Sequence, residues 1–289
     1  MRPMTFPAGS AEFELVTVQS GACSLRSLNF GETFHPVVGP MHEAELLHVR
    51  QQRLAERAEA AGETFIIWDV GLGAAANAIA VIDALQSIPA TIELHSFECD
   101  LGALQFALKH AARLSYLVPH LSSLRELLAT GSASIGAIRW ILHHGNFRQR
   151  LGSDSLPAPH SILFDPYSPS SNPELWSLEA FRALHRRLHP ERPCLLTNYT
   201  RSTAVRVALL LAGFYVGHGI AVAEKDQTTI ATNHFSLLDQ PLGTDWLRRA
   251  HRSTRSAPPR DGDGSGGPIS PEDWETLLEH PQFLGAISH

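Results

Sequence analysis

The sequence predicts an α/β protein with a mostly parallel, doubly wound sheet, and three observations support this fold class. Short apolar runs alternate with helix-forming segments along most of the chain, which is typical of successive strand and helix units. The run at 65–70 is apolar almost throughout, as in a parallel strand that is buried on both faces. Gly71 and Gly73 follow this run directly and allow a sharp turn into the next helix.

The part before this run is expected to add a hairpin and a helix. Alternating apolar and polar residues at 13–18, a Ser-Gly turn at 20–21 and a second run at 24–28 predict a β-hairpin. Between 41 and 61, apolar residues at helical spacing predict one amphipathic helix. We therefore assign residues 1–60 to an N-terminal hairpin and helical extension.

The main domain is expected to span residues 61–240, with strands and helices in alternation. After the strand at 65–70 we expect, in order, a helix at 74–85, a strand at 91–97, a helix at 100–113, strands at 138–142 and 160–165, a helix at 176–188, a strand at 193–198 and a helix at 202–212. Two further runs, at 214–222 and 228–235, flank a charged loop and predict an antiparallel pair that closes the sheet.

The C-terminal part, 241–289, is expected to hold a linker and one short helix. Residues 253–270 are so rich in Gly, Pro and Ser that we expect a flexible linker there. Ser270 and Pro271 suit the N-cap and first turn of a helix that runs through Leu278.

Composition limits the classes of function. A chain of 289 residues with 44% hydrophobic content can bury a sizeable core, and its net charge of −6 argues against a broadly basic nucleic-acid surface, although a local patch remains compatible with that total. Three cysteines far apart fit reduced thiols better than a disulfide framework. No apolar run approaches the roughly 20 residues of a membrane span, and the N-terminus has no apolar signal core, so we expect a cytoplasmic protein.

The glycine turn is a candidate site for an adenosine cofactor, because the helix after such a turn presents unpaired N–H groups to a ligand. Glu98 follows Gly71 by 27 residues, at the end of the next strand, where a carboxylate can accept hydrogen bonds from both ribose hydroxyls. The alternative is a solvated surface glutamate. Ala75 replaces the third glycine of a dinucleotide fingerprint, and no phosphate-binding lysine follows, which disfavours NAD and nucleoside triphosphates.

Two further polar residues are candidates for the same cofactor. Asp69 immediately precedes the turn and can hydrogen-bond, directly or through water, to a cationic methionine group; alternatively it caps the turn backbone. Asn146 follows the strand at 138–142, where such folds place a side chain against the adenine amino group.

The residues Asp165, Pro166 and Tyr167 follow the fourth strand of the main domain, at the sheet edge where open α/β folds bind ligands. They are similar to the D-P-P-Y loop of amino-methyltransferases, so we assign them the catalytic site. An alkyl amine has a pKa around 10, and methyl transfer to it needs a group that orients the nitrogen and accepts charge. Asp165 can do this, while Tyr167 can offer its ring face to a planar substrate or to the methyl cation. The alternative is a proline-rich loop that only packs.

Two residues are candidates for substrate contacts. Trp176 can stack on a base, but it is equally suited to the core. Lys225, in the loop of the closing hairpin, is either a solvated charge or a residue near the site. The sixteen histidines show no H-E-x-x-H spacing, so we predict no metal, and neither a P-loop nor a nucleophile elbow is present.

With these motifs the chain resembles the methyltransferase domain of bacterial MnmC-type enzymes, which complete 5-methylaminomethyl-2-thiouridine at the wobble position of tRNA. The matching pieces lie within 13–235, and an antiparallel closing hairpin is typical of methyltransferases. They are residues 30–35, Gly39, 42–44, the glycine turn through Asn77, 96–98, 165–169 and 172–176.

The resemblance implies a Rossmann-like class I methyltransferase fold with S-adenosylmethionine as its cofactor. In that family the glycine turn and the acid of the second strand bind the cofactor, and the loop aspartate faces the aminomethyl group; these roles carry over to Gly71, Gly73, Glu98 and Asp165. The full set of predicted cofactor contacts is Asp69, Gly71, Gly73, Asn77, Glu98 and Asn146.

The predicted function is therefore N-methylation of the aminomethyl group of a wobble uridine, with tRNA as a transient partner. Because the 289 residues hold no flavin-dependent oxidoreductase half, a separate enzyme would supply the aminomethyl substrate. The alternatives are a methyltransferase of a small-molecule amine and a non-catalytic homologue that binds cofactor or RNA. Candidate phosphate contacts, which are alternatively ordinary solvated charges, are Arg182, Arg186, Arg187, Arg192, Arg201 and Arg206.

Overall fold

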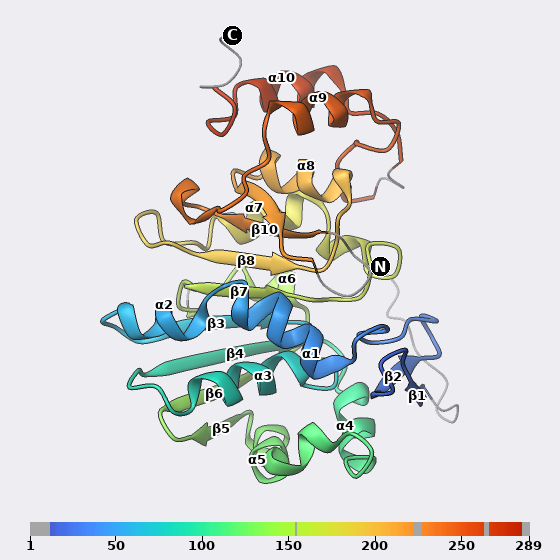
Figure 1. The fold of residues 1–289 in the computed structure, drawn as a ribbon, viewed down its shortest axis with the longest axis vertical. Helices are drawn as coiled ribbons and strands as arrows, with labels where there is room; N and C mark the ends of the chain where they lie inside the picture. The colour runs from blue at the N-terminus through green and yellow to red at the C-terminus, as the bar shows by residue number, and fades with distance from the viewer. Residues whose placement is uncertain (1–11, 154, 222–226, 263–265, 285–289) are drawn as a thin grey trace.

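The computed structural model describes residues 12–153, 155–221, 227–262 and 266–284. Within these ranges an eight-stranded mixed sheet runs through the molecule with helices on both faces (Figure 1), which confirms the predicted α/β class. Its order is β5-β6-β4-β3-β7-β8-β10-β9. The strands are β3 (Phe65–Val70), β4 (Ile92–Glu98), β5 (Ser132–Ile135), β6 (Ile138–His144), β7 (Ser161–Phe164), β8 (Leu195–Asn198), β9 (Tyr215–Gly219) and β10 (Thr228–Thr232).

The five strands β6, β4, β3, β7 and β8 are parallel, and the closing pair β9 and β10 is antiparallel, as predicted. Every residue of β3 is buried because both faces of the strand are covered. Trp68 points into a core shared with α6 (Phe147–Arg150), α7 (Leu178–His185) and α8 (Thr203–Leu211), whereas Ile67 points into a core shared with α3 (Ala76–Leu85), α4 (Gly102–Lys109) and α5 (Leu121–Thr130).

The strand order reverses at β3, which pairs with β4 on one side and with β7 on the other. At such a switch point the loops after neighbouring strands diverge and leave a crevice beyond their carboxyl ends. The residues that follow β3, β4 and β7 therefore share one edge of the sheet.

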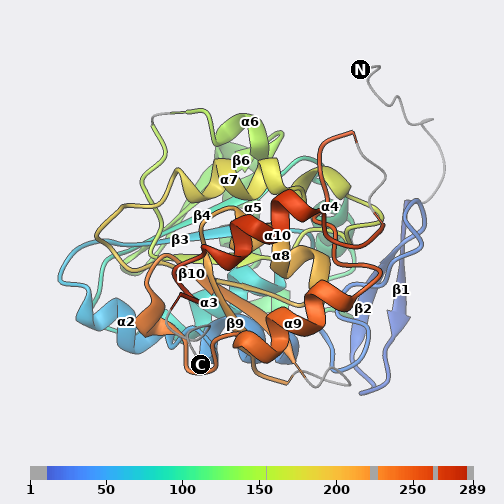
Figure 2. The same cartoon turned by 90° about the horizontal axis from the view of Figure 1, so that it is seen from above.

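The predicted N-terminal hairpin is confirmed as β1 (Phe13–Thr17) and β2 (Cys23–Ser27). Figures 1 and 2 place it at the opposite end of the molecule from α2 (Leu54–Ala60). The single helix predicted over 41–61 is wrong, because it divides into α1 (Pro40–Ala44), the π-helix η1 (Glu45–Arg50) and α2, with Arg53 in a left-handed conformation (φ 49°). The interruption accompanies two buried polar contacts, since His48 Nδ1 and Gln52 Nε2 lie 2.8 and 2.7 Å from Thr197 Oγ1.

Several parts of the chain differ from the expected pattern because tertiary contacts determine their structure. The sequence did not predict η2 (Ser115–His120), α5, β5 or α9 (Thr244–Arg252), although β5 pairs with β6 and α9 buries Trp246. The flexible linker is also a wrong prediction for the described part of 253–270. Ser256 is fully buried, its N–H donates to Gly267 O (2.9 Å), and Leu178 N donates to Pro259 O (2.8 Å).

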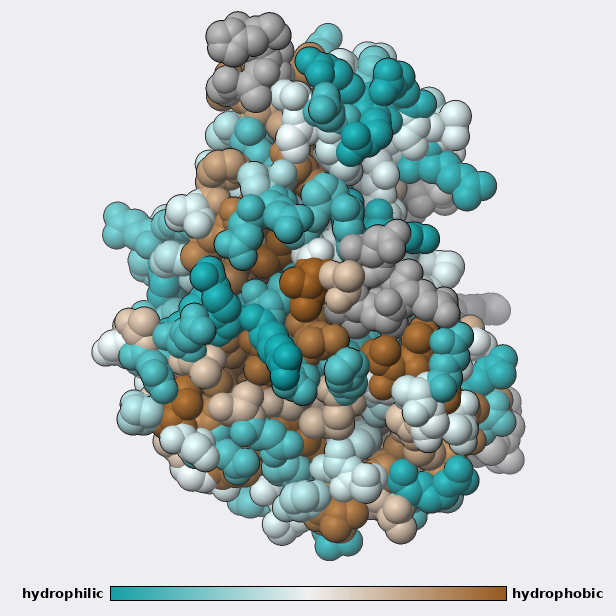
Figure 3. All heavy atoms as spheres, in the orientation of Figure 1, coloured by the Kyte–Doolittle hydropathy of each residue, from teal (hydrophilic) through white to brown (hydrophobic). Residues whose placement is uncertain are grey.

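The C-terminal helix is confirmed as α10 (Pro271–Leu278), capped by Ser270, whose Oγ accepts from Asp273 N at 3.1 Å. The domain boundaries at 60 and 240 stay predictions. Hydrophilic and hydrophobic residues are interspersed on the face shown in Figure 3. In the described ranges no helix has both the length and the apolar character needed to cross a membrane.

Candidate active site

A cavity of about 870 Å³ lies at the carboxyl ends of β3, β4 and β7. Four parts of the main domain line it: the glycine turn, the residues at the end of β4, the segment 145–147 and the loop 165–168. Much of the remaining wall comes from the turn that follows β2, within residues 27–36, and further side chains come from Glu43, Tyr199 and residues 171–175. The crevice expected at the switch point is therefore closed on one side by the N-terminal extension.

The two glycines of the turn serve different needs. Gly71 has φ 95°, and a Cβ on it would lie 2.6 Å from Asp165 O, so only glycine allows the ends of β3 and β7 to approach. Gly73 has φ 51° and faces the cavity, where a Cβ would lie 3.2 Å from the Phe34 ring. Ala75 takes a left-handed conformation (φ 65°) that glycine adopts more easily, at a cost of about 1 kcal/mol.

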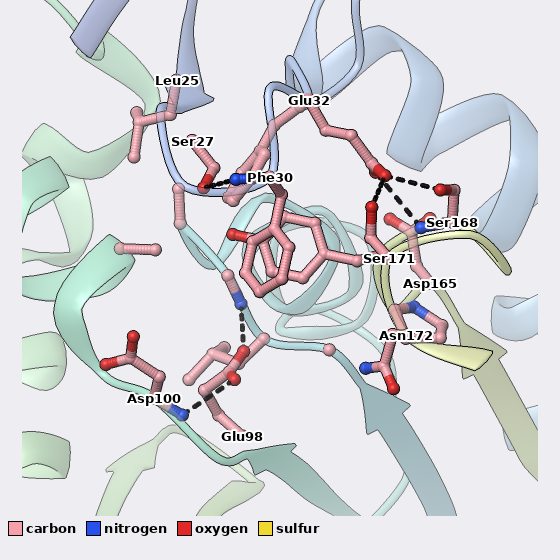
Figure 4. Close-up of a pocket in the computed structure, with 18 of the residues that line it drawn as sticks. Leu25, Ser27, Phe30, Glu32, Glu98, Asp100, Asp165, Ser168, Ser171 and Asn172 are labelled. Carbon is pink, nitrogen blue, oxygen red and sulfur yellow. Dashed lines mark hydrogen bonds between the residues drawn. The ribbon is translucent and has the colours of Figure 1, made fainter. Parts of the chain in front are cut away.

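Glu98 is fixed beside the turn by main-chain N–H groups (Figure 4). Its Oε2 accepts from Gly73 N at 3.0 Å, and its Oε1 accepts from Cys99 N at 2.8 Å and from Asp100 N at 3.1 Å. Burial raises the pKa of Glu98, and these hydrogen bonds partly offset that rise. Glu98 is thus a wall of the cavity and not a solvated surface glutamate.

Asp69 lies beneath the turn and does not line the cavity. It is fully buried, and Ser96 Oγ donates to its Oδ2 at 2.7 Å, while its Oδ1 has no hydrogen-bond partner. Burial raises the pKa of Asp69 to about 7, and the charges of Asp165 and Glu98 add to the rise. Direct contact with a ligand in the cavity is therefore not supported, and Asp69 can act on such a ligand through its charge.

The asparagines predicted for the cofactor both line the cavity but have protein partners. Asn146 caps α6, since its Oδ1 accepts from Gln149 N at 3.3 Å. Asn77 Nδ2 donates to Asp165 Oδ2 at 2.8 Å and so orients the carboxylate of the predicted catalytic residue.

The backbone of the loop after β7 is held at successive residues. Asp165 N donates to Val70 O at 2.9 Å, the Tyr199 hydroxyl donates to Pro166 O at 3.2 Å, and Trp176 Nε1 donates to Tyr167 O at 2.8 Å. These contacts keep the three predicted catalytic residues, which all line the cavity, in fixed positions.

The predicted substrate contact of Trp176 is wrong. The side chain is fully buried, does not line the cavity and packs edge-to-face against Phe164 with ring centroids 5.1 Å apart. A base in the cavity cannot stack on it, and its role is to support the loop. Lys225, the other predicted substrate contact, lies outside the described residues.

Residues 30–35 contribute side chains to the cavity to which the sequence assigned no role. Figure 4 shows Glu32 reaching across to Ser168 and Ser171, and the Phe30 ring packs on Tyr167 with centroids 4.5 Å apart. The only available signal was that this segment belongs to the motifs on which the family resemblance depends.

His35 lies between two carboxylates in the same wall. Its Nε2 is 3.9 Å from Asp165 Oδ2, and its Nδ1 is 3.8 Å from Glu43 Oε2. It also has a left-handed backbone (φ 47°) directly before Pro36, a conformation that costs a non-glycine residue about 1 kcal/mol or more. Strain of this kind is concentrated at functional sites.

The charges in the cavity have one sign. Carboxylates outnumber cationic groups, and among the described lining residues there is no lysine or arginine and one histidine, His35. The acidic lining residues are Glu32, Glu43, Glu98, Asp100, Asp165 and Glu174. A positively charged ligand is therefore favoured over a phosphate group.

Three of the predicted phosphate-binding arginines are engaged within the protein. Arg206 is buried and donates to Thr228 O at 2.8 Å, Arg187 donates to Leu156 O at 2.7 Å, and Arg192 donates to Ala158 O. For Arg206 the prediction of a phosphate contact is wrong. The other three arginines of the predicted set, Arg182, Arg186 and Arg201, are exposed. No group of three or more potential metal ligands occurs in the part of the chain that the structure describes.

Comparison with known proteins agrees with this geometry. Residues 135–234 match the family described as S-adenosyl-L-methionine-dependent methyltransferase. The crystal structure of MNMC2 from Aquifex aeolicus superposes with a TM-score of 0.70 at 22% identity, over 95% of this chain and 84% of that one. The likeness to this structure shows a Rossmann-like fold, and over residues 135–234 the chain is similar to S-adenosylmethionine-dependent methyltransferases.

The names of the curated relatives are more specific than the description of the family. The chain is 28% identical over 200 residues to the tRNA 5-methylaminomethyl-2-thiouridine biosynthesis bifunctional protein MnmC of Azoarcus sp. (strain BH72), covering 66% of this chain and 31% of the relative. The protein of the same name from Burkholderia vietnamiensis (strain G4 / LMG 22486) is 24% identical over 250 residues, covering 81% and 36%. This chain therefore spans about a third of the length of these relatives.

The residues of the cavity fit S-adenosylmethionine. Gly71 and Gly73 bring the backbone of the turn into the cavity lining, Glu98 places a fixed carboxylate beside them, and the acidic lining suits the positive sulfur of this cofactor.

Proposed function

We propose that this protein N-methylates the aminomethyl group of a modified wobble uridine in tRNA, converting 5-aminomethyl-2-thiouridine to 5-methylaminomethyl-2-thiouridine. The observation that carries the proposal is the position of Asp165, held by Asn77 beside the glycine turn in a cavity of carboxylates. Such a cavity suits a substrate that arrives as an ammonium ion, and the names of the relatives supply the identity of the nucleoside.

S-adenosylmethionine supplies the methyl group in this reaction. We assign its ribose to Glu98, its adenine to the neighbourhood of Asn146, and its methionine end to the turn at Gly71 and Gly73. Asp69 contributes a negative charge from beneath the turn. Asn77, predicted as a cofactor contact, acts through the carboxylate of Asp165.

The remaining chemistry is to orient the amine and remove its proton. Asp165 accepts an N–H hydrogen bond from the substrate, and we assign the contact with the planar base to Tyr167, which lines the cavity and packs on Phe30. We assign the proton to His35, whose Nε2 lies 3.9 Å from Asp165 Oδ2 in the same wall of the cavity. Glu43, on the far side of the ring, stabilises the charge that His35 gains.

The phosphates of the tRNA remain outside the acidic cavity, and only the base enters. We assign phosphate contacts to the exposed arginines Arg182, Arg186 and Arg201. The protein then acts in the cytoplasm on tRNA whose aminomethyl group a separate enzyme has supplied.

The test is methyl transfer from labelled S-adenosylmethionine to tRNA that carries 5-aminomethyl-2-thiouridine, followed by mass spectrometry of the nucleosides. We expect 5-methylaminomethyl-2-thiouridine as the product, and accumulation of the unmethylated nucleoside in cells that lack the protein. Absence of the methylated nucleoside in both experiments contradicts the tRNA assignment.

A small-molecule amine is the second candidate substrate. The internal hydrogen bonds of Arg187, Arg192 and Arg206 favour it, because they remove half of the arginines expected to bind phosphate. Methylation of amines such as benzylamine or spermidine at rates that exceed transfer to the tRNA identifies this class. Transfer that requires the tRNA excludes it.

A further inference from the structure

The turn after β2 forms a second support for the catalytic loop, from outside the main sheet. It contains the motif 30–35, which none of the cofactor contacts explains. The turn is itself fixed, since Ser27 N donates to Glu32 O at 2.8 Å and Phe34 N donates to Leu25 O at 2.8 Å. Its side chains therefore reach the cavity from a defined backbone.

Glu32 makes the contacts between this turn and the loop (Figure 4). Ser168 N donates to Glu32 Oε2 at 3.1 Å, Ser168 Oγ donates to Oε1 at 2.5 Å, and Ser171 Oγ donates to Oε1. The partners are 136 and 139 residues apart in sequence. Hydrogen bonds to an ionised acceptor are about twice as strong as neutral ones, so three of them form an effective restraint.

The position of these bonds gives them a consequence for catalysis. The backbone groups of Asp165, Pro166 and Tyr167 are held by Val70, Tyr199 and Trp176, all of which belong to the main domain. Ser168 is the next residue, and its N–H is held by Glu32. Without Glu32 the N–H of Ser168 would lose its partner, and on the cavity side the loop would keep the bond from Asn77 to Asp165 and the packing of Phe30 on Tyr167.

We propose that Glu32 is a positioning residue for methyl transfer, which holds the Asp165–Ser168 loop in its reactive geometry through Ser168 and Ser171. The expected effect on methyl transfer rests on the proposed function. The restraint of the loop by Glu32 rests on the structure alone. The N-terminal extension is then a component of the substrate site.

The restraint is tested without any substrate, by hydrogen exchange. In Glu32→Ala we expect the amides of residues 168 and 170–172 to exchange about tenfold faster or more, while those of β3 keep the rate of the parent protein. Glu14→Ala is the matched control, because Glu14 lies on β1 in the hairpin that precedes this turn, is half-exposed and pairs with Arg26 at 3.9 Å. Unchanged exchange at 168–172 overturns the proposal, whatever the substrate proves to be.

The catalytic part is tested by a double-mutant cycle in methyl transfer to the aminomethyl tRNA. We expect Glu32→Ala to lower kcat about tenfold to a hundredfold, with the affinity for S-adenosylhomocysteine within about threefold of the parent. In a Ser168→Ala/Ser171→Ala background the same change should cost less than it does in the parent protein, because both hydroxyl partners are gone and only the N–H of residue 168 still donates to Glu32.

Three outcomes overturn the positioning role. One is faster exchange with unchanged kcat, one is an equal fall of kcat and cofactor affinity, and one is full additivity with the serine substitutions. If the parent protein transfers no methyl group to the tRNA, the proposed function fails, and the hydrogen-exchange result still decides whether Glu32 restrains the loop.

Discussion

The glycine-turn side of the cavity is one continuous segment of chain, residues 69–100, whereas the loop side joins residues 30–35 to residues 165–171. On the glycine-turn side a single carboxylate, Glu98, accepts from three main-chain N–H groups between Gly73 and Asp100. On the loop side most contacts come from side chains, chiefly Glu32, Trp176 and Asn77, which reaches Asp165 from the glycine-turn side.

Because of this difference, the two sides of the cavity should respond differently to single substitutions. The glycine-turn side consists of a strand, a turn, a helix and the next strand. The parallel pairing of β3 with β4 fixes its geometry, with Asp69 opposite Ser96 and Val70 opposite Phe97. The loop side depends on individual side chains, so single substitutions there should change the geometry of the reaction and leave the glycine-turn side intact. The predictions below test that separation.

The largest effect is expected for Asp165→Ala, on the loop side. Loss of the group that orients the amine should lower methyl transfer about a hundredfold or more, with cofactor affinity within a few-fold of the parent. Single-turnover transfer and calorimetry with S-adenosylhomocysteine measure the two quantities.

Asp83→Ala is the control for the Asp165 variant, because it removes a carboxylate that pairs with His120 at 2.9 Å and does not line the cavity. It should leave both quantities unchanged. If Asp165→Ala weakens cofactor binding as much as it slows transfer, the two sides are not separate and the assigned role is wrong.

The same contrast explains what the sequence could predict. The strand at 65–70, the glycine turn and Glu98 follow from local apolar pattern and spacing, and the structure places all of them at one sheet edge. Asp165 was found for the same reason, because it ends a buried strand beside β3. These features depend on order along the chain, which the sequence displays.

Features that depend on contacts between distant segments were missed or wrong. Nothing near Glu32 in the sequence reveals Ser168, 136 residues away. A tryptophan beside a site suits either a ligand or the core, and Trp176 proved to be core, because it is fully buried and packs on Phe164. The Gly- and Pro-rich segment bonds to the main domain through Pro259, which composition alone does not show.

An intermediate effect is expected for Glu98→Ala, on the glycine-turn side. Loss of the proposed ribose contact, and of the bond to Gly73 N, should weaken cofactor binding about tenfold or more. The transfer rate at saturating cofactor should stay within about threefold of the parent, since Glu98 does not contact the reacting amine.

Asp100→Ala is the matched control for Glu98, because its carboxylate lines the same cavity but accepts from Gly102 N at 2.8 Å. Its affinity for S-adenosylhomocysteine in calorimetry should equal that of the parent. A Glu98 variant with normal affinity and slow transfer reverses the assignment of the two sides.

The smallest effect is a pH dependence of cofactor binding that arises from Asp69. Because burial raises its pKa to about 7, this carboxyl is mostly protonated at pH 6 and mostly ionised at pH 8. A positive sulfur above the turn favours the ionised form, so S-adenosylmethionine should bind about three- to tenfold more tightly at pH 8 than at pH 6. S-adenosylhomocysteine, whose sulfur is neutral, should show a smaller change, and Asp69→Asn should make the two ligands respond alike. Equal pH dependence of both ligands in the parent protein would mean that the charge of Asp69 does not reach the cavity, and that the glycine-turn side acts through Glu98 and main-chain geometry alone.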